Sequence, residues 1–508
     1  MFQLKGSRLI AANTAISYSR TVISIVFVLF SSRWVLEALG TIDFGLNSLV
    51  GSIMAIVLFL NTVLANGDAR FFALGIGQNN QTELNKVFNT LLSLHIALPL
   101  IVSTIGFLIG EFIIRYYLVI PPERLQSTLI VFRIGIFVSL LNMMTVPFSA
   151  LFVANQNILE SSLISLFQTF LLFISAYSLR FFSGSSDKLI IYSIMVSLVY
   201  IIVSAIMVVL SCRKYECTKI RTDYFFNRRL SSEVIRFSFW NMLGDFGHLI
   251  RTQGTSIIVN LFFGPSGNAA LGIANQVAIQ SANLTNAMIS STRPEIYRRA
   301  GEGNLQSAMF LSNLTSKIGL FLILAVGVPV ILNLDDLLKL WLVNVPTGAG
   351  TLCECFIIMF VIEKMAVGQG SYLCAIGKVA LVNVLIMFFY SSALIFPFCG
   401  LIQLGIGGIG ISCILSMILS RCSILYCMGK YTDFSLVSYM KSTAAPVLLL
   451  SLILYAFVQF KIELHSSSIM ELAVNGAIVF VITAFISMFL LFKKKERLKI
   501  FHLLFVKK

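Results

Sequence analysis

The chain has little charge for its length. Only 12% of its 508 residues are Asp, Glu, Lys or Arg, whereas a soluble globular domain averages about 25%. Hydrophobic residues make up 57% of the chain, and the mean hydropathy is +0.91. This composition excludes an ordinary soluble protein and predicts a polytopic membrane protein. The formal net charge of +15 is then explained by membrane topology and does not indicate a nucleic-acid partner.

Motifs for metals and nucleotides are also lacking. The nine cysteines show no metal-ligand spacing, and most lie singly in apolar runs, where cysteine acts as a small hydrophobic residue. No nucleotide-binding motif is present, so ATP is not expected to drive the protein directly. We therefore expect no cofactor and no metal. The first apolar run follows Lys5 and Arg8 and lacks a persuasive cleavage site, which indicates a retained helix.

Long apolar runs, in contrast, are abundant. A spanning helix needs about 20 mostly apolar residues, and we predict an all-α polytopic membrane protein with about fourteen transmembrane helices. The predicted helices are 9–32, 43–66, 87–112, 125–153, 158–182, 188–211, 234–262, 268–292, 306–333, 347–375, 379–399, 405–429, 443–461 and 469–492.

The basic residues between these helices are distributed unevenly. With fourteen helices, 24 of the 37 Lys and Arg residues fall on the side of the two termini, and 7 fall on the opposite side. Positively charged loops stay on the cytoplasmic side of a membrane. The sequence therefore predicts a multi-pass protein with both termini cytoplasmic.

The longest loop, 212–233, is basic and divides the chain near its middle. It predicts an N-terminal six-helix lobe at 1–211, a cytoplasmic linker at 212–233 and a second six-helix lobe at 234–429. Two additional helices and a basic cytoplasmic tail are expected at 430–508.

An internal repeat supports the two lobes. A shift of 228 residues pairs Asn13 with Asn241, Ser17 with Asp245, Arg20 with His248, Ser24 with Thr252 and, one helix later, Asn47 with Asn275. The first four positions of each set are spaced i, i+4, i+7 and i+11, so they share one helix face. We expect these faces to be walls of one cavity between two lobes in a pseudo-twofold arrangement.

Basic residues also occur inside the apolar runs. Arg20 and Arg251 lie near the middle of their runs, and four more cations lie within others: Arg133, Lys317, Lys364 and Arg421. Only Asp245 and Glu363 are acids at comparable depth. A charge at the bilayer centre costs roughly 2.5–3.5 kcal/mol on insertion scales, so it is rarely kept without a role. A cationic interior predicts a transporter of anionic cargo, such as a phosphate-bearing molecule.

Two pairs of segments resemble a known family. The segment RWVLEALGTIDFGLNSLVGSI at 33–53 and ARFFALGIGQNN at 69–80 resemble the N-terminal signature of bacterial polysaccharide (O-antigen-type) flippases. The segments FFGPSGNAALGIANQVAIQ at 262–280 and STRPEIYRRAGEGN at 291–304 resemble the matching part of their second half. That family lies in the multidrug/oligosaccharidyl-lipid/polysaccharide exporter superfamily.

The resemblance implies a function. Such proteins flip polyprenyl-diphosphate-linked oligosaccharide across the bacterial cytoplasmic (inner) membrane by alternating access, for polysaccharide or lipopolysaccharide (O-antigen) biosynthesis. Partners would be that lipid, membrane lipids, and a polysaccharide polymerase or glycosyltransferases. Related lipid II flippases carry arginines on the first helix of each lobe; Arg20 matches the first position, and in the second lobe the choice lies between His248 and Arg251.

Chemistry supports a set of candidate site residues. Guanidinium binds phosphate through a planar fork, so we assign diphosphate binding to Arg20 and Arg251. Polar side chains expected to bind phosphate or sugar are Asn13, Ser17, Asn241 and Asn275. Asp245 and His248 lie one turn apart and are candidates for ion coupling. An alternative for Arg20 remains open: its role could be structural, as an ion pair with Asp245 across the two lobes.

Three rival functions are considered. A cation-coupled drug-type antiporter on the same fold would favour cationic cargo, and its relatives use intramembrane acids that the first lobe lacks. A membrane-embedded glycosyltransferase would need a sizeable outer loop, whereas the loop with Asp335 and Asp336 has only about 13 residues. A scaffold without transport would not require intramembrane arginines. We therefore expect a transporter and not an enzyme.

Overall fold

The computed structural model is helical throughout its described residues, and none of these residues forms a strand. It describes residues 7–77, 80–155, 157–182, 187–225, 227–228, 230–232, 234, 246–378, 380–449, 468–493 and 496–497. The chain divides into two compact units, Met1–Ala269 and Ala270–Lys508. The predicted linker 212–233 lies in the first unit, and the predicted lobe boundaries stay a prediction.

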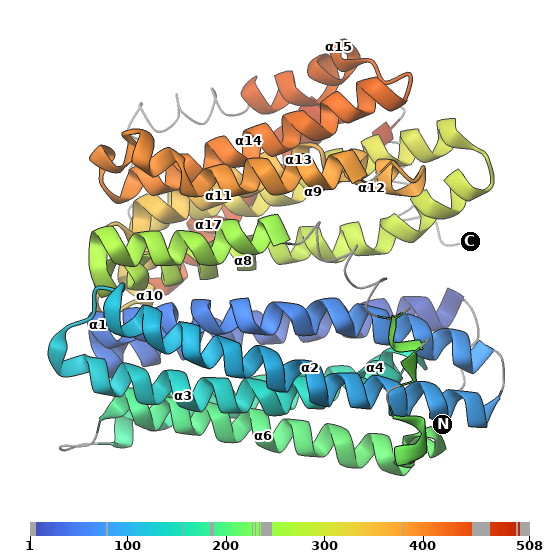
Figure 1. The fold of residues 1–508 in the computed structure, drawn as a ribbon. Helices are drawn as coiled ribbons and strands as arrows, with labels where there is room; N and C mark the ends of the chain where they lie inside the picture. Colours follow the sequence, from blue (N-terminus) through green and yellow to red (C-terminus); the bar gives the residue numbers. More distant parts are fainter. Residues whose placement is uncertain are drawn as a thin grey trace. The chain divides into compact units, whose positions relative to one another are not determined.

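The first unit is built from long helices that follow one another along the chain (Figure 1). They are α1 (Ser7–Gly77), α2 (Gln81–Tyr116), α3 (Pro122–Met144), α4 (Val146–Ala154), α5 (Ile158–Ser178), α6 (Lys188–Lys214), the π-helix η4 (Ile250–Gly254) and the start of α8 (Thr255–Gly301). Short 3₁₀ turns lie at Leu179–Phe181, Glu216–Thr218 and Thr222–Tyr224.

Two glycines mark the boundaries between predicted helices. In α1 the helix bends at Gly40, which has φ 74°, between the predicted helices 9–32 and 43–66. In α8 it bends at Gly264, with φ 64°, between 234–262 and 268–292. Positive φ favours glycine because other residues would bring Cβ into a clash. Each kink thus separates two helical segments that correspond to two predicted spans.

The second half of α1 extends further than the sequence predicted. The prediction ended this helix at 66, whereas α1 continues to Gly77. Asp68, Phe71 and Phe72 are buried, and their i, i+3, i+4 spacing places them on one helix face. The sequence prediction ended at residue 66 because the following stretch is polar. In the structure Asp68 faces the interior and not water, so this polar stretch is part of the helix.

The second unit contains the rest of α8 and a further series of helices. They are α9 (Leu305–Leu332), α10 (Leu334–Trp341), α11 (Ala349–Met365), α12 (Val367–Ala375), α13 (Ala380–Ser391), α14 (Ile406–Tyr431), α15 (Leu436–Tyr439), the π-helix η8 (Met440–Ala444) and α17 (Ile469–Leu491). Three 3₁₀ turns lie at Ser392–Leu394, Phe396–Cys399 and Leu401–Leu404. The predicted outer loop with Asp335 and Asp336 forms the short helix α10.

One predicted helix in each unit is broken. The prediction 125–153 corresponds to α3 and α4, which separate at Thr145, two residues before Pro147. The prediction 347–375 corresponds to α11 and α12, which separate at Ala366 (φ −120°, ψ 20°). Proline lacks the N–H that a helix interior needs, which explains the first break.

Among the described residues, nine stretches are long and apolar enough to cross a membrane. They are Val22–Phe59, Gln81–Tyr116, Pro122–Met144, Leu159–Phe181, Lys188–Lys214, Phe246–Asn283, Leu305–Leu332, Ile406–Tyr431 and Met470–Leu491. The first and sixth contain the bends at Gly40 and Gly264 and so combine two predicted spans each. These helices confirm a multi-pass membrane protein, whereas the total of fourteen stays a prediction.

Candidate functional site

Arg20 lies on the first part of α1, and its side chain is half-buried. The side chains of Asn13 and Ser17, on the same predicted face, lie outside the described residues, although their backbone belongs to α1. Arg20 is followed by Val22, Ile23 and Val26, which are all exposed. Exposed aliphatic residues on a spanning helix suit contact with lipid. A guanidinium thus stands beside an apolar surface.

Arg251 occupies an irregular part of its helix. It lies in the π-helix η4, directly before α8, and only 3% of the residue is exposed. Its carbonyl accepts a 2.5 Å hydrogen bond from the Thr255 hydroxyl. Single π-turns within α-helices are frequent at functional sites. The sequence predicted the buried arginine, but it did not predict the π-turn that carries it.

The coupling pair predicted from the sequence is described only in part. Asp245 and its neighbour in the stripe, Asn241, lie outside the described residues. His248 lies one turn before Arg251 and is exposed, and its carbonyl accepts a hydrogen bond from the Thr252 hydroxyl at 2.9 Å. The proposed link between Asp245 and His248 therefore stays a prediction.

Asn275 lies on α8 beyond the bend and is half-buried. Further along the same helix, the Asn283 amide donates to Gln280 Oε1 at 2.7 Å. Asn286 accepts a hydrogen bond from the Lys364 ammonium of α11 at 2.8 Å. The polar residues of this part of α8 thus serve partly as contacts between helices, which is a common use of amides in membranes.

Three further intramembrane cations lie beside acidic side chains. Arg133 and Arg115 both donate to Glu111, and the Lys317 ammonium lies 3.0 Å from both carboxylate oxygens of Glu496. The Lys364 ammonium donates to Asn286 of α8 and also lies 3.1 Å from Glu363, its neighbour in the chain.

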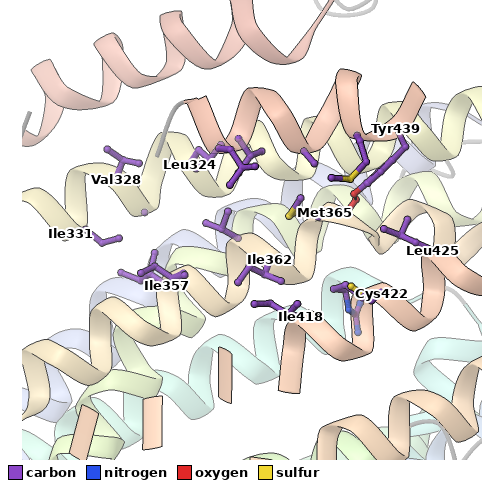
Figure 2. A pocket seen from close by; sticks show the side chains of 18 residues that line it. Leu324, Val328, Ile331, Ile357, Ile362, Met365, Ile418, Cys422, Leu425 and Tyr439 are labelled. Atoms are coloured by element: carbon purple, nitrogen blue, oxygen red, sulfur yellow. The ribbon is translucent and has the colours of Figure 1, made fainter. Parts of the chain in front are cut away.

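Arg421 borders an apolar cavity of about 490 Å³ in the second unit, between α9, α11, α14 and the segment from Tyr439 to Leu448 (Figure 2). The wall is almost entirely aliphatic: it includes Val328, Ile331, Ile357, Ile362 and Leu425. Arg421 donates to the Tyr390 hydroxyl at 2.6 Å, and the Tyr439 hydroxyl donates to the Met365 carbonyl at the end of α11. The cavity therefore suits a hydrocarbon chain, with one guanidinium at its wall.

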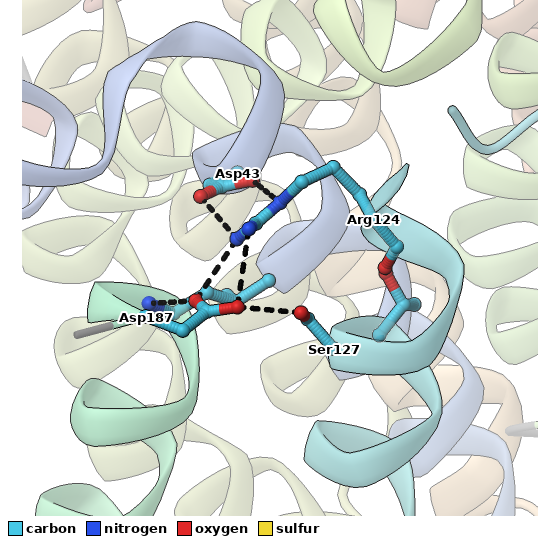
Figure 3. A network of polar contacts seen from close by, with 6 residues as sticks. Asp43, Arg124, Ser127 and Asp187 are labelled. Carbon is cyan, nitrogen blue, oxygen red and sulfur yellow. Dashed lines mark hydrogen bonds and ion pairs between the residues drawn. The ribbon is translucent and has the colours of Figure 1, made fainter. Parts of the chain in front are cut away.

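A charged cluster in the first unit joins three helices near their ends (Figure 3). Arg124, in the first turn of α3, donates to both oxygens of Asp43 on α1 at 2.7 and 2.6 Å. It also donates to both oxygens of Asp187 at 3.0 and 3.1 Å, and Ser127 donates to Asp187 at 2.5 Å. This cluster was missed from the sequence because its members are far apart in the chain.

Two opposing effects act on Asp187, which caps α6 outside the membrane-spanning segments. Partial burial raises the pKa of its carboxyl, whereas the hydrogen bonds from Ser127 and Arg124 lower it, and the net pKa is below the usual value. The Asp187 carboxylate also accepts from the Leu189 N–H, so it caps the helix. The cluster is therefore a structural tie that holds helix ends together.

No protein-family model matches the chain. No curated protein matches it either. Solved structures, however, share its fold. An inward-facing multidrug resistance MATE family transporter of the MOP superfamily has a TM-score of 0.69 at 14% identity, covering 82% of this chain and 98% of its own. The lipid II flippase MurJ, in an inward closed conformation, has a TM-score of 0.66 at 12% identity, covering 93% and 98%.

A third similar structure is a MOP superfamily transporter from Pyrococcus furiosus Vc1, described as having a binding pocket of reverse polarity that suggests a different function. Its TM-score is 0.64 at 14% identity, and it covers 85% of this chain and 98% of its own. The chain therefore shares the fold of these three structures.

Proposed function

We propose that this protein flips a polyprenyl-diphosphate-linked oligosaccharide across the bacterial inner membrane. The observation that carries the proposal is the burial of Arg251 in a membrane-spanning, π-helical segment. A permanently charged guanidinium in such a place is costly unless an anion shares the site. A diphosphate offers two or more negative charges and suits the planar fork of arginine.

Arg20 and Arg251 are the proposed diphosphate ligands. Asn13, Ser17, Asn241 and Asn275 are proposed to supply hydrogen bonds to phosphate or sugar hydroxyls. In this proposal the two arginines belong to facing helices of the two lobes and meet the headgroup in turn as the protein alternates between its open states. The fourteen-helix, two-lobe arrangement is part of the same proposal.

The aliphatic cavity beside Arg421 supports lipid-linked cargo. A small soluble cation would gain nothing from an aliphatic wall, whereas an isoprenoid chain is stabilised by burial at about 0.8 kcal/mol per CH₂ group. Among the described residues that line it, Arg421 is the one charged group. An anion attached to a hydrocarbon chain is thus a better match than a cationic drug.

A drug-type antiporter remains the alternative function, because a multidrug transporter is among the similar structures. The similar transporter from Pyrococcus furiosus is described as having a binding pocket of reverse polarity that suggests a different function. The buried Arg251 favours anionic cargo here. We propose that the flipped glycan enters polysaccharide, lipopolysaccharide or O-antigen biosynthesis, with a polymerase or glycosyltransferases as partners.

The decisive experiment is lipid flipping by the purified protein in liposomes. The probe is a fluorescent polyprenyl-diphosphate oligosaccharide, tested with wild type, Arg20→Ala and Arg251→Ala. Each variant should lose at least about tenfold in flipping rate, because one charge-assisted phosphate contact is worth roughly 1.5–3 kcal/mol. Arg180→Ala is the matched control, since Arg180 is exposed and paired with Glu37.

Three outcomes would change the proposal. Flipping that is unaffected by either substitution would assign both arginines a structural role. If the alanine variants lose both flipping and folding, the test is repeated with Arg20→Lys and Arg251→Lys. Lysine keeps the positive charge but lacks the planar guanidinium that binds phosphate through two N–H groups. A wild type that flips no lipid but exports a small cation against a proton gradient would establish the antiporter alternative.

A further inference from the structure

A second cavity, of about 530 Å³, lies in the first unit where α5 begins and α6 ends. Three aliphatic and three charged side chains line it: Leu163, Ile164, Leu210, Glu160, Arg213 and Lys214. None of them is among the residues proposed to bind cargo. The apolar spans Leu159–Phe181 and Lys188–Lys214 begin and end beside it. The cavity therefore lies at the depth where hydrocarbon meets lipid headgroups.

The charged side chains of the cavity are not balanced. The Lys214 ammonium donates to both carboxylate oxygens of Glu160, at 2.5 and 2.6 Å, and so joins α6 to α5. Arg213, the preceding residue, is exposed. Within the described part of the chain its guanidinium has no acidic partner. Two cations and one carboxylate leave a net charge of +1 at the cavity, so one negative charge would neutralise it.

Apolar side chains continue from this cavity along both helices. On α6, Ile202 and Val209 are exposed, and with Arg213 they are spaced i, i+7 and i+11, so the three share one helix face. On α5, Leu163 and Phe167 are exposed one turn apart. Exposed apolar side chains on spanning helices contact acyl chains. A hydrocarbon chain can thus lie along the two helices and end beside the Arg213 guanidinium.

Aromatic rings hold the end of α6 in place. The ring centres of Tyr215 and Phe152 lie 5.5 Å apart, and the Tyr215 hydroxyl accepts a hydrogen bond from the Asn157 amide at 2.6 Å. The Lys214 ammonium lies 5.9 and 6.0 Å from the two ring centres. Tyrosine suits the membrane–water interface because one end of its ring is polar. These contacts preorganise the cations, which lowers the entropy cost of binding.

We propose that this cavity binds one anionic phospholipid whose headgroup carries a single negative charge, such as phosphatidylglycerol. The Arg213 guanidinium donates to the phosphate oxygens, and Lys214 adds a second cation while it keeps Glu160. One acyl chain is buried against Leu163 and Leu210 and is stabilised by this burial. Basic pockets between membrane helices on the cytoplasmic side bind anionic headgroups, and the sequence predicts that this end of α6 is cytoplasmic.

Two other occupants fit the cavity less well. A zwitterionic phospholipid brings an ammonium group as well as a phosphate, and the two cations repel that ammonium. An acidic peptide would match the charge but would bury no hydrocarbon chain against the aliphatic side chains. The proposed lipid is distinct from the cargo, so this inference goes beyond the proposed function and does not depend on it.

Two substitutions, each with a matched control, separate headgroup binding from chain binding. Arg213→Gln removes the charge without an acidic partner, and Arg228→Gln removes an equal charge from an exposed arginine outside the cavity lining. Leu163→Trp fills the apolar part of the cavity and leaves every charge in place. Its control is Leu198→Trp, because Leu198 is exposed on α6 and does not line the cavity.

The first measurement is native mass spectrometry of the purified full chain, titrated with phosphatidylglycerol or phosphatidylethanolamine. Wild type should bind one phosphatidylglycerol at least about tenfold more tightly than phosphatidylethanolamine, and Arg213→Gln should lose at least about tenfold in affinity. Arg228→Gln should change affinity less than about twofold, because distant exposed charges are screened. Leu163→Trp should lose about tenfold, the equivalent of roughly two displaced CH₂ groups, and Leu198→Trp should bind as wild type does.

Equal binding of the two lipids by wild type would overturn the proposal. So would equal losses in Arg213→Gln and Arg228→Gln, because a general basic surface would then attract the lipid without a site. If Arg213→Gln does not fold, Leu163→Trp decides the question, since its substituted side chain is exposed. Unchanged phosphatidylglycerol binding by Leu163→Trp would refute a chain-binding cavity.

The second measurement is the melting temperature in uncharged detergent, with and without phosphatidylglycerol. A ligand that binds only the folded state stabilises it by mass action. The lipid should therefore raise the melting temperature of wild type, Arg228→Gln and Leu198→Trp, and should not raise that of Arg213→Gln or Leu163→Trp. An equal rise in wild type and Arg213→Gln would overturn the proposal. Neither measurement contains cargo, so failure of the flippase function would leave this result unaffected.

Discussion

Arg124 is bound to two carboxylates at once, and this arrangement makes it sensitive to substitution. Its guanidinium donates to Asp43 and Asp187, and the three side chains are only 18–24% exposed. Two carboxylates facing the same position would repel each other if the cation were removed. A partly buried charge cluster of this kind is therefore worth more than a surface ion pair.

We predict that Arg124→Met destabilises the first unit by about 2–3 kcal/mol, through loss of charge-assisted hydrogen bonds. The apparent melting temperature in detergent should fall by roughly 5 to 10 °C. Arg115→Met is the matched control, because Arg115 is exposed and Glu111 keeps Arg133. A control that is as damaging as Arg124→Met would contradict this assignment.

The same cluster predicts a dependence on acid. The pKa of Asp187 is lowered in the folded protein, so its stabilisation is present above the unfolded-state value of about 3.9. It is lost as pH falls through the lower folded value. Wild type should therefore lose stability below about pH 4 more steeply than Arg124→Met. Melting curves at a series of pH values test this, and parallel curves would refute it.

At the residue scale, the sequence signal for a candidate site was the free-energy cost of a charge within an apolar run. Arg251 was chosen because a charge within an apolar run is expensive, and it is buried. The pairing of Lys317 with Glu496 was not predictable, because 179 residues separate them. Asp68 was missed for a different reason: its polar surroundings in the sequence resemble a loop, whereas its side chain faces the interior of a helix bundle.

At the scale of helices, close contact between α12 and α9 depends on Gly368. A Cβ at this position would lie 1.9 Å from the Ser312 carbonyl oxygen, which belongs to the backbone of α9. The Gly368 N–H also donates a hydrogen bond to the Ser316 hydroxyl of α9 at 2.9 Å. The broken helix thus joins α9 through backbone as well as side chains.

We predict that Gly368→Ala destabilises the second unit by at least about 2 kcal/mol, because the clash is with backbone that has no free rotamer. Gly370→Ala, two residues along the same helix, is the control. There the Cβ would lie 3.7 Å from Ile424 Cδ1, an ordinary contact. The comparison uses melting temperature and expression level, and equal values for the two variants would show that α12 can move away from α9.

The last described helix, α17, is joined to α9 by a buried ion pair. The Lys317 ammonium contacts Glu496 beyond the end of α17, and the rings of Phe321 and Phe492 lie 6.1 Å apart at the same junction. Either partner alone would be a buried charge. We predict that Lys317→Met and Glu496→Gln each cost about 3–5 kcal/mol, whereas the double variant costs much less.

Limited proteolysis of the C-terminal segment, together with melting temperature, measures this coupling. Glu471→Gln is the control, since Glu471 is an exposed acid at the opposite end of α17. Additive effects of the two single substitutions would show that the pair does not hold α17 to α9.

Helix positions were predictable from the sequence because apolar runs of spanning length give a strong signal. The breaks at Thr145 and Ala366 and the π-turn at Arg251 were not predicted. Such features depend on contacts from other helices: Met143 is satisfied by His95, and the start of α12 is satisfied by Ser316. Local sequence does not encode those partners.

At the scale of the whole molecule, the sequence and the structure divide the chain differently. The sequence predicts a linker at 212–233, whereas the compact units meet at Ala269 and Ala270 within α8. The segment after α6 is tied to α2, because Asn85 and Asn89 donate to the Lys219 carbonyl. These hydrogen bonds therefore fix the first residues of the predicted linker to α2 of the first unit.

These ties predict where the chain tolerates a cut. Co-expressed fragments 1–225 and 226–508 should assemble and flip lipid, because the contacts of the 215–225 segment with α2 remain within the first fragment. Fragments 1–269 and 270–508 should fail, because that cut lies inside α8 at two fully buried alanines and would expose unsatisfied helix ends in the bilayer.

Co-purification of tagged fragments and flipping in liposomes measure both outcomes. The uncut chain carrying the same tags is the control for expression. The opposite result would contradict this prediction: fragments 1–269 and 270–508 would assemble, and fragments 1–225 and 226–508 would not. Folding would then require an intact 225–226 junction and would tolerate a cut within α8.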